Sequence, residues 1–505
     1  MRTHRKAMSA ACIAAVMTLS AGCSGLQGAG NDADSLTLSM SAAFPDLDPQ
    51  HSTSTVNYSI NFDNVYEGLV RLDGKTPEIL PSLATKWEQV DPTTHRLTLR
   101  DGVKFHNGEP FDAEAAAFSV NRVLDDKGTA ELRSYFSDFE NAKAIDKSTV
   151  EIKTSRLVPD FLLNLTYIMM VPPKATQRDG LSEKPVGTGP YEFVSKTTDS
   201  AMYKPFDGYW GEKPPATKIK VVSRPEVASA VAGLLTGEID IASDIPNELV
   251  NEVPAVRSAQ VLEPVLLRLN SLSGITKDPK VRRALDLAID STTLREQFLG
   301  ADYSSDPQCQ LAPKGVHGHN PDLAMDEYDP AEAKALIENA GVEGQPIDIV
   351  GVQGRYPKGQ EIVEAVMSQI EEVGLKPKSR ILDLQGWLDQ IYLGSDKAPE
   401  IALIGINVDQ WTLFQPYSSI VSADSDLSNF PHKEFPKVQS LMDEAAETAD
   451  ETTRDDILEE AAAEICASDA FIWLYNYDQI WGTQEGITWD SRRDGRIVWS
   501  TIESD

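Results

Sequence analysis

The sequence predicts an α/β protein with more than one domain. The chain has 505 residues, too many for a single hydrophobic core, so we expect two or three domains. Short strand-like runs alternate with longer amphipathic helices, and the order strand, helix, strand over 347–404 predicts a partly parallel sheet. The predicted strands cover 36–40, 96–100, 149–153, 218–222, 347–350 and 400–404.

Helix starts and stops are clearly marked in the second half of the chain. Asp278 followed by a proline predicts an N-cap, and the apolar stripe after it predicts one helix that ends at Gly300. Asp329 begins a second helix in the same way, and Gly341 ends it. A third apolar stripe is ended by Gly374.

The segment 97–124 carries the sharpest local pattern. Residues 97–106 alternate between apolar and polar side chains, with an Asp-Gly pair at 101 that is typical of a hairpin turn. An Asn-Gly pair at 107 predicts a second turn. Asp112 then caps a predicted helix whose apolar face includes Val120. Nothing in this segment resembles a catalytic centre.

The charge of the chain excludes one class of partner. The formal net charge is −32, and the acidic residues are spread along the chain rather than gathered in one tail. A nucleic-acid-binding protein needs a basic stripe to meet the phosphates, so we expect no nucleic-acid partner. The acidic balance favours cationic or zwitterionic ligands only weakly, because it also keeps an ordinary surface soluble.

The first 22 residues are typical of an export signal. Arg2, Arg5 and Lys6 precede an apolar run over 7–19, which is too short for a comfortable membrane span. The sequence Leu-Ser-Ala-Gly that leads to Cys23 resembles a bacterial lipobox, which implies cleavage before Cys23 and a lipid on its thiol. Cleavage nearby by an ordinary signal peptidase is the alternative, because the lipobox more often has leucine where this chain has the serine.

The predicted compartment bears on the remaining cysteines. We expect residues 23–35 to form a flexible tether and the rest of the chain to lie at the outer face of the cytoplasmic membrane. Cys309 and Cys466 then stay in an oxidising environment. They are far apart in sequence, so whether they pair is left open.

The sequence contains no motif for catalysis or metal binding that stands out. It has no GxSxG, HExxH, Walker or CxxC pattern, and the Gly-Thr-Gly-Pro run at 187–190 predicts a tight turn rather than a phosphate-binding loop. His317 and His319 lie in a Pro/Gly-rich loop without a third ligand beside them. We therefore expect no catalytic residue, no metal and no cofactor, and these patterns give an enzyme no positive support.

Several sequence blocks occur in an order that points to one family. The blocks are FPDLDP at 44–49, VYEGLVR at 65–71, PSLATKW at 81–87, DGVKFHNGEPFDAEAAAFSVNRVLD at 101–125, VGTGPY at 186–191, LTGEIDIA at 235–242 and DPKVRRA at 278–284. Over roughly 36–500 the chain thereby resembles the family 5 extracellular solute-binding proteins of bacterial ABC importers, which include dipeptide- and oligopeptide-binding proteins.

The resemblance implies a periplasmic-binding-protein-like α/β fold. Two lobes enclose a ligand cleft, and an extra small domain makes three domains in all. The chain is implied to cross between the lobes near Asn270 and near Asp478. The implied division is signal peptide 1–22, tether 23–35, domain I over 36–75, 186–269 and 479–505, domain II over 76–185, and domain III over 270–478.

The resemblance also implies ligand-binding residues. In peptide binders of this family, an aspartate in a Gly-Trp-x-x-Asp block holds the α-ammonium of the peptide, and here the block ends at Asp409, with Ile406 in place of the tryptophan. Arg355 is a candidate for a bidentate contact with a ligand carboxylate. A loop cap and a solvated loop arginine are the alternative roles of these two residues. The other candidates are Asn57, Tyr58, Asn270, Trp387 and Trp411.

The function implied by the resemblance is capture without chemistry. We expect a monomeric, lipid-anchored protein that binds short peptides outside the membrane and delivers them to the transmembrane subunits of an ABC permease. The same fold with a nickel chelate, an oligosaccharide or an opine-like solute is one alternative, and a peptide sensor is another. A secreted hydrolase is the alternative from a different class.

Overall fold

The computed structural model describes most of the chain. The described residues are 35–41, 46–51, 60–125, 132, 135–174, 180–393, 397–408, 410–423, 425 and 427–504. They all belong to the second of two units, Asp34–Asp505, so the predicted signal peptide lies outside them. Among the described residues, no helix has both the length and the apolar character needed to cross a membrane.

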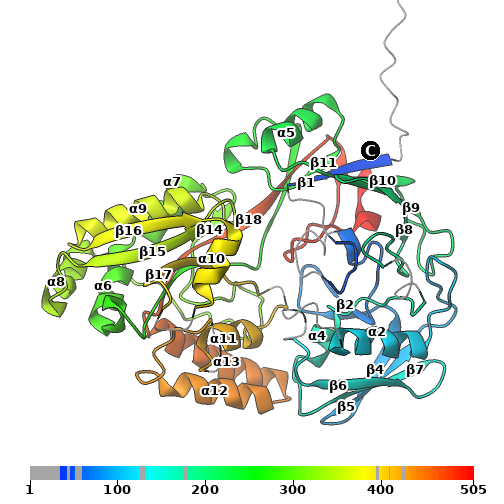
Figure 1. The fold of residues 1–505 in the computed structure, drawn as a ribbon, viewed down its shortest axis with the longest axis horizontal. Helices are drawn as coiled ribbons and strands as arrows, with labels where there is room; N and C mark the ends of the chain where they lie inside the picture. Colours follow the sequence, from blue (N-terminus) through cyan, green and yellow to red (C-terminus); the bar gives the residue numbers. More distant parts are fainter. Residues whose placement is uncertain are drawn as a thin grey trace, which may run out of the picture. The chain divides into compact units, whose positions relative to one another are not determined.

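Two large apolar cores divide the unit Asp34–Asp505 into two lobes (Figure 1). The core of lobe 1 joins residues between Leu36 and Ile241 to residues 481–502 from the end of the chain. The core of lobe 2 is built mainly from residues between Leu262 and Tyr475. Strands and helices are mixed in both lobes, which confirms the predicted α/β class.

The sheet of lobe 1 is centred on the first strand. β1 (Ser35–Met40) pairs in parallel with β10 (Lys218–Ser223) on one side and with β11 (Ile241–Ala242) on the other. β9 (Ser200–Pro205) and β8 (Tyr191–Lys196) extend the sheet in antiparallel fashion beyond β10. Because β1 and β11 are parallel, their carboxyl ends meet at one edge of the sheet.

Lobe 2 contains a mixed sheet. β15 pairs in parallel with β16 and β17, and β13 lies antiparallel between β17 and the first half of β18. The partly parallel sheet predicted over 347–404 is therefore confirmed. The strands are β13 (Val265–Leu269), β15 (Pro346–Val352), β16 (Lys376–Leu382), β17 (Ile401–Gly405) and β18 (Phe471–Thr483).

The helices of the protein surround these sheets (Figure 1). α9 and α10 contact β15 and β16, and α11, α12 and α13 form a separate helical group in lobe 2. The helices are α5 (Val227–Thr236) in lobe 1 and α6 (Pro279–Ala288), α7 (Ser291–Phe298), α8 (Pro330–Ala340), α9 (Gly359–Glu372), α10 (Leu384–Ile391), α11 (Phe414–Val421), α12 (Pro436–Glu447) and α13 (Glu451–Cys466) in lobe 2.

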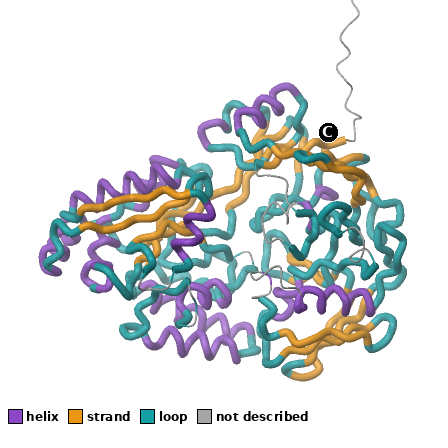
Figure 2. The backbone as a smooth tube through the Cα atoms, in the orientation of Figure 1, coloured by secondary structure: helices purple, strands orange, loops and turns teal. Residues whose placement is uncertain are grey.

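A small domain adjoins lobe 1 (Figure 2). Its four strands follow the order β4–β5–β7–β6, and α2 packs against β6 and β7. The short pair β2 (Val70–Leu72) and β3 (Ile79–Pro81) precedes this sheet, and α4 (Phe161–Leu165) follows it. Its elements are β4 (Ala84–Asp91), β5 (Thr94–Leu99), α2 (Ala113–Asp125), β6 (Phe139–Ala144) and β7 (Thr149–Thr154).

Two segments connect the lobes. β12 (Ala255–Gln260) pairs with the second half of β18, whereas β13 pairs with the first half, so the chain passes between the lobes over 261–264 and again along β18. The first crossing lies earlier than the implied position near Asn270. Asn270 is instead buried in lobe 2, where its amide donates to the carbonyl oxygen of Ala398 at 3.1 Å.

The predicted strands and most of the helix ends are confirmed. β1, β5, β7, β10, β15 and β17 lie at the six predicted positions, and Gly341 and Gly374 end α8 and α9 with left-handed φ of 69° and 99°. The single helix predicted after Asp278 is wrong. α6 ends at Ala288, and Asp290 caps the separate helix α7 by accepting from the Thr293 amide at 2.9 Å.

The hairpin predicted over residues 97–106 is also wrong. β5 ends at Leu99 and pairs with β4 and β7, which occupy both of its edges, so residues 103–106 have no edge to join. Lys104 forms a short bridge with Pro110 around the Asn-Gly turn instead. Asp112 caps α2 as predicted, accepting from two amide groups of the first turn at 3.1 Å each.

The structure answers two further questions from the sequence. Cys309 and Cys466 form a disulfide, with their Cα atoms 5.3 Å apart. The Gly-Thr-Gly-Pro run at 187–190 is a packed turn, because a Cβ on Gly187 would lie 2.0 Å from the carbonyl oxygen of Val65. The predicted turn is therefore present, and the structure adds that its first glycine allows close packing against Val65.

Candidate ligand-binding site

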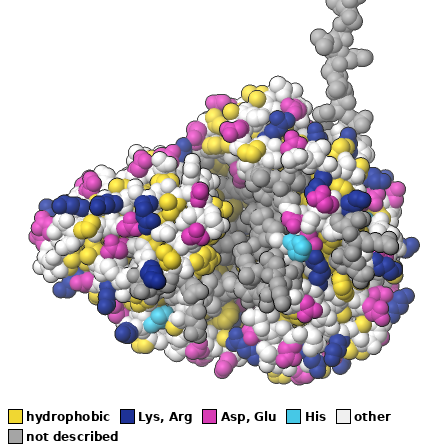
Figure 3. Space-filling model, viewed as in Figure 1, with side chains coloured by type: hydrophobic (Ala, Val, Ile, Leu, Met, Phe, Trp, Pro, Cys, Tyr) yellow, Lys and Arg dark blue, Asp and Glu magenta, His cyan; other side chains and the backbone are white. Residues whose placement is uncertain are grey.

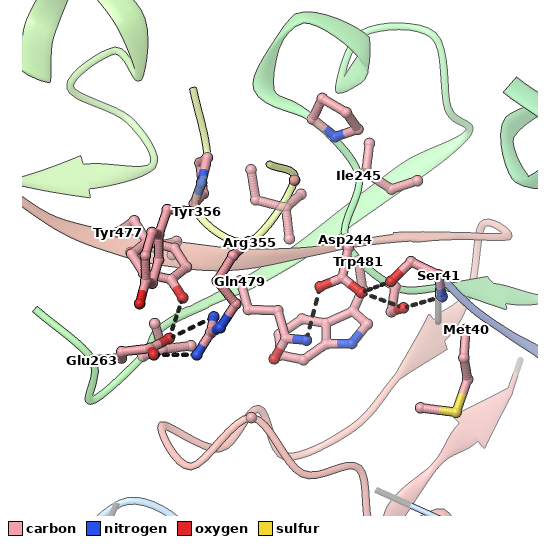
Figure 4. A pocket seen from close by; sticks show the side chains of 18 of the residues that line it. Met40, Ser41, Asp244, Ile245, Glu263, Arg355, Tyr356, Tyr477, Gln479 and Trp481 are labelled. Atoms are coloured by element: carbon pink, nitrogen blue, oxygen red, sulfur yellow. Dashed lines mark hydrogen bonds and ion pairs between the residues drawn. The ribbon is translucent and has the colours of Figure 1, made fainter. Parts of the chain in front are cut away.

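A cavity of about 1460 Å³ lies between the two lobes. Lobe 1 contributes the ends of β1 and β11, and lobe 2 contributes the segment 354–361 that follows β15. The crossing segment 261–264 and the middle of β18 also line it, and Figure 4 shows side chains from all of these elements. Ligands of α/β proteins bind outside the carboxyl ends of the strands, so this cavity is the candidate site.

Glu263, from the first crossing segment, organises one part of the cavity (Figure 4). The guanidinium of Arg355 donates to both of its carboxylate oxygens, from Nη2 to Oε1 and, at 3.2 Å, from Nη1 to Oε2. The hydroxyl of Tyr477 donates to Oε2 at 2.7 Å. Glu263 thereby joins the two crossings, since Tyr477 lies on β18.

The carboxylate of Glu263 shifts the pKa values of its two partners, Arg355 and Tyr477. The carboxylate of Glu263 raises the pKa of Arg355 above its usual value, although partial burial acts in the opposite direction. Burial raises the pKa of Tyr477 well above 10, and the carboxylate of Glu263 adds to that effect. Arg355 therefore stays charged and Tyr477 neutral. Arg355 was predicted from the sequence to contact a ligand carboxylate, but in the structure it is already paired with the carboxylate of Glu263.

Asp244 forms the other polar part of the cavity. It comes just after β11 and has a φ of 57°, in the left-handed region that side-chain-bearing residues seldom adopt. Its Oδ2 accepts from the hydroxyls of Ser41 at 2.5 Å and Ser243 at 2.7 Å, and its Oδ1 accepts from Gln479 Nε2 at 3.2 Å. The carboxylate is exposed and is held in one orientation by Ser41 and Ser243, which follow β1 and β11, and by Gln479 in the middle of β18.

Arg493 is the cavity cation with neutral hydrogen-bond partners. Its guanidinium donates to the carbonyl oxygen of Lys314 at 3.0 Å and to Gln260 Oε1 at 2.9 Å, and it stacks 5.1 Å above the ring of Trp411. It forms no ion pair with any carboxylate in the described part of the chain. Burial lowers its pKa, and the nearby Asp478 opposes that shift.

Aromatic side chains complete the walls. Trp387 on α10 is buried and donates its indole N–H to the carbonyl oxygen of Leu403 at 3.1 Å. Tyr356 accepts from the amide of Gly405 at 2.7 Å. Trp481 and Trp499 line the side of lobe 1. Fixed carboxylates, guanidinium groups and aromatic rings equip the cavity to bind a charged organic solute.

Only some of the residues that were predicted from the sequence to bind the ligand line the cavity in the structure. Arg355 and Trp387 line the cavity. Trp411 and Asn270 are buried away from it, although Trp411 supports Arg493. The remaining candidates Asn57, Tyr58 and Asp409, and the predicted lipidation residue Cys23, lie outside the described residues, so their roles stay predictions.

Sequence reasoning missed four polar residues of the cavity, namely Asp244, Glu263, Tyr477 and Arg493. A signal was available for Asp244, because it follows the buried strand in the block LTGEIDIA, and strand ends carry ligand contacts. For the pair Glu263 and Arg355 no local signal exists, since the residues are 92 positions apart.

An acidic cluster lies outside the cavity. Oxygens of Asp286, Asp326 and Asp469 lie within 4.8 Å of one another, which is close enough for metal ligands. Arg283 already lies among them, with Nη1 3.5 Å from Asp286 and 3.6 Å from Asp469. Its guanidinium supplies the positive charge that a metal would bring, so the cluster is explained by its own cation.

Comparison with solved structures defines the class of fold. A Helicobacter pylori periplasmic binding protein, DppA in complex with the peptide STSA, superimposes with a TM-score of 0.78 at 21% identity, over 93% of this chain and 98% of that one. The ABC transporter substrate-binding protein CtaP from Listeria monocytogenes gives a TM-score of 0.82 at 21% identity, over 93% of this chain and 99% of that one. The chain therefore has the periplasmic-binding-protein fold, with the predicted two lobes and small domain.

Sequence comparison gives the family. The family described as bacterial extracellular solute-binding proteins, family 5 Middle, matches residues 78–425, and this protein belongs to it. The dipeptide-binding protein of Escherichia coli is 28% identical over 82% of this chain and 84% of its own length. The nickel-binding periplasmic protein of the same organism is 31% identical over 61% of this chain and 64% of its own length. The family serves solute binding and transport, not catalysis.

Proposed function

We propose that this protein is a lipid-anchored substrate-binding protein that captures short peptides and delivers them to an ABC permease. The observation that carries the proposal is the cavity, whose volume of about 1460 Å³ exceeds the roughly 300–1,000 Å³ of typical small-molecule sites. A ligand of several residues fits this space better than a single metal complex. The similarity to the dipeptide-binding protein of Escherichia coli supports the same class of ligand.

The charged groups of the cavity suit a zwitterion. A peptide carries an ammonium and a carboxylate, and each needs a partner when it leaves water. Arg493 is bound only by neutral acceptors among the described residues, so a ligand carboxylate can approach it without displacing an anion. Arg355 is the second guanidinium, held by Glu263. For the ammonium we retain Asp409, on the resemblance to the peptide-binding block.

The lipid anchor rests on the lipobox before Cys23. Attachment to the membrane surface keeps a binding protein near its permease, and closure of two lobes on a ligand presents a changed surface to that partner. The division into domains I, II and III is retained as part of this proposal, with the boundary between domains I and III moved from 269/270 to the crossing over 261–264. We expect the protein to act as a monomer.

The test is native mass spectrometry of residues 31–505, which include the whole compact unit Asp34–Asp505. We expect a mass excess of a few hundred daltons, spread over several species and released on denaturation, as mixed peptides. A single sharp excess that contains nickel or sugar would contradict the peptide assignment. If no excess is found, titration with di- to pentapeptides replaces it, and the absence of binding to any of them would reject the proposal.

A variant tests the role of Asp409. Asp409→Asn should weaken the binding of short peptides about tenfold or more, because a charge-assisted contact to the ammonium is lost. Asp101→Asn, in an exposed turn of the small domain, removes the same charge elsewhere and serves as the control. Equal peptide affinity in the Asp409 variant and the parent would show that another group holds the ammonium.

A further inference from the structure

The carboxylates of the cavity differ in whether they have a cation. The described lining residues include the carboxylates of Asp244, Glu248, Glu263, Glu361, Asp478 and Asp494. Arg355 pairs with Glu263, and Lys358 pairs with Glu248 at 2.7 Å and with Glu361 at 3.8 Å.

The last two acids besides Asp244 differ from each other, since only Asp494 has a cation. Asp494 pairs with Arg492 at 2.5 Å and with Arg496 at 3.7 Å. Asp478, like Asp244, forms no ion pair among the described residues, but it is partly buried and burial raises its pKa, so it is a weaker anion than the exposed Asp244. Asp244 is left with hydroxyl and amide donors, and within the described ranges it forms no ion pair.

We propose that Asp244 binds a cationic group of the cargo, so that the cavity prefers peptides with a lysine or arginine side chain over neutral and acidic ones. The inference rests on the proposed function, because it names the class of peptide for the same cavity. The terminal ammonium and carboxylate of a peptide use one anion and one cation of the site. An additional uncompensated carboxylate then selects for an additional positive charge.

The geometry of Asp244 favours this role. Two hydroxyl donors occupy Oδ2, whereas Oδ1 receives only the amide of Gln479, so Oδ1 keeps an acceptor site free for an ammonium or guanidinium. The donors fix the carboxylate before the ligand arrives, which reduces the ordering cost of binding. Its left-handed φ of 57° is a local strain of the kind found at ligand sites.

The position of Asp244 in the cavity also favours contact with a cationic group of the ligand. It stands at the carboxyl edge of the lobe 1 sheet, where β1 and β11 end side by side, and its side chain is exposed to the cavity. In Figure 4, Gln479 extends from β18 toward Asp244, while Arg355 and Glu263 form a separate group. A peptide whose carboxylate is bound by a guanidinium group of the cavity can therefore place a cationic side chain at Asp244.

The experiment compares tripeptides that differ only in the central side chain. Isothermal titration of the purified chain with Ala-Lys-Ala, Ala-Met-Ala and Ala-Glu-Ala should give the tightest binding for the lysine peptide, about tenfold or more above the methionine peptide. In Asp244→Asn this preference should disappear, because the affinity for Ala-Lys-Ala falls to about that for Ala-Met-Ala. Asp101→Asn, as the charge-matched control, should keep the preference.

A second variant guards against a folding defect. Asp244→Gly removes the carboxylate and places at φ 57° the residue that tolerates this conformation best, so it should fold at least as well as the parent. It should lose the lysine preference in the same way. Circular dichroism and the unfolding temperature of each variant without ligand check the fold.

The outcomes separate the two proposals. Equal affinity of the parent for all three peptides, or a lysine preference that survives both Asp244 variants, would overturn this inference and leave peptide binding standing. If the parent binds no peptide but binds arginine or agmatine in an Asp244-dependent way, the peptide proposal falls and the cation site stands. Binding of none of these compounds would overturn both.

Discussion

At the scale of single residues, the buried acid Glu67 shows how burial changes the pKa of a carboxyl group. Glu67 is 4% exposed and lies under the packed turn at 187–190. Its carboxyl receives hydrogen bonds from Thr188 at 2.8 Å, Tyr209 at 3.1 Å and Trp210 at 2.9 Å. Burial nevertheless dominates and raises its pKa to about 7, because three neutral donors replace only part of the lost hydration.

The raised pKa of Glu67 predicts a pH-dependent stability. The neutral carboxyl fits the folded state, so its contribution is complete below the unfolded pKa of 4.5 and is lost as the pH rises through about 7. In Glu67→Gln, the amide can accept from Trp210 and Thr188 and donate to the Tyr209 hydroxyl. We expect this variant to gain up to about 3 kcal/mol on the parent between pH 4 and pH 8.

Urea unfolding at several pH values measures this difference. Glu485→Gln is the control, because Glu485 is exposed and its substitution leaves the buried acid in place. A constant difference between Glu67→Gln and the parent across the pH range would show that the pKa of Glu67 is the same in the folded and unfolded states.

At the scale of elements, capping decides where helices divide. The apolar stripe after Asp278 continues past Ala288, yet the backbone breaks there and α7 starts anew behind Asp290. The amide of Asp290 itself bonds to Gln369 Oε1 of α9 at 3.2 Å, so a contact from a distant helix helps to hold the break. Apolar periodicity alone cannot show this, because the contact comes from another element.

The cap at Asp290 gives a prediction for this element. Asp290→Ala should destabilise the protein by about 1 kcal/mol, because the Thr293 amide loses its acceptor at the start of α7. Asp290→Asn should stay close to the parent, since asparagine caps helices about as well as aspartate. Chemical unfolding followed by circular dichroism compares the three proteins, and equal losses in both variants would indicate that the charge matters more than the cap.

At the scale of the whole molecule, a buried ion pair joins the lobes away from the ligand cavity. Asp160 precedes α4 on the side of lobe 1, and Arg454 lies on α13 in lobe 2. Their atoms Oδ1 and Nη2 are 2.6 Å apart, with side chains only 5% and 4% exposed. Burial raises the pKa of Asp160, and the charge of Arg454 opposes this shift.

This ion pair predicts that the stability of the folded protein depends strongly on the contact between the two lobes. Arg454→Met should destabilise the protein by about 3–5 kcal/mol, because it leaves a buried carboxylate without its partner. The double variant Asp160→Asn with Arg454→Met should recover much of the loss. A double-mutant cycle by chemical unfolding measures the coupling, and additive losses would show that the two residues act independently.

The excess of acid belongs to the molecule as a whole. On the face seen in Figure 3, acidic and basic side chains are interspersed, and neither sign forms a large patch there. Because the acidic residues are also spread along the whole sequence, the net charge of −32 acts as a diffuse field that aids solubility. The selectivity that we propose depends on the single carboxylate of Asp244 inside the cavity.

Much of the fold could be predicted because its signals are local. The cap at Asp112, the glycine that ends α9 at Gly374 and the alternation of β7 each lie within a few neighbouring residues. The candidate site was predicted less completely. Arg355 and Trp387 do line the cavity, but the partner of Arg355 comes from a crossing segment 92 residues away.

By itself the sequence determined the α/β class, the family blocks, the absence of a nucleic-acid-binding charge pattern and the helix ends at Gly341 and Gly374. Only the tertiary structure decided that Cys309 pairs with Cys466, that Glu263 binds Arg355, and that Asp244 stands in the cavity without a cation among the described residues. Propensity and capping act over a few residues of chain, whereas ion pairs and disulfides depend on how distant segments are brought together.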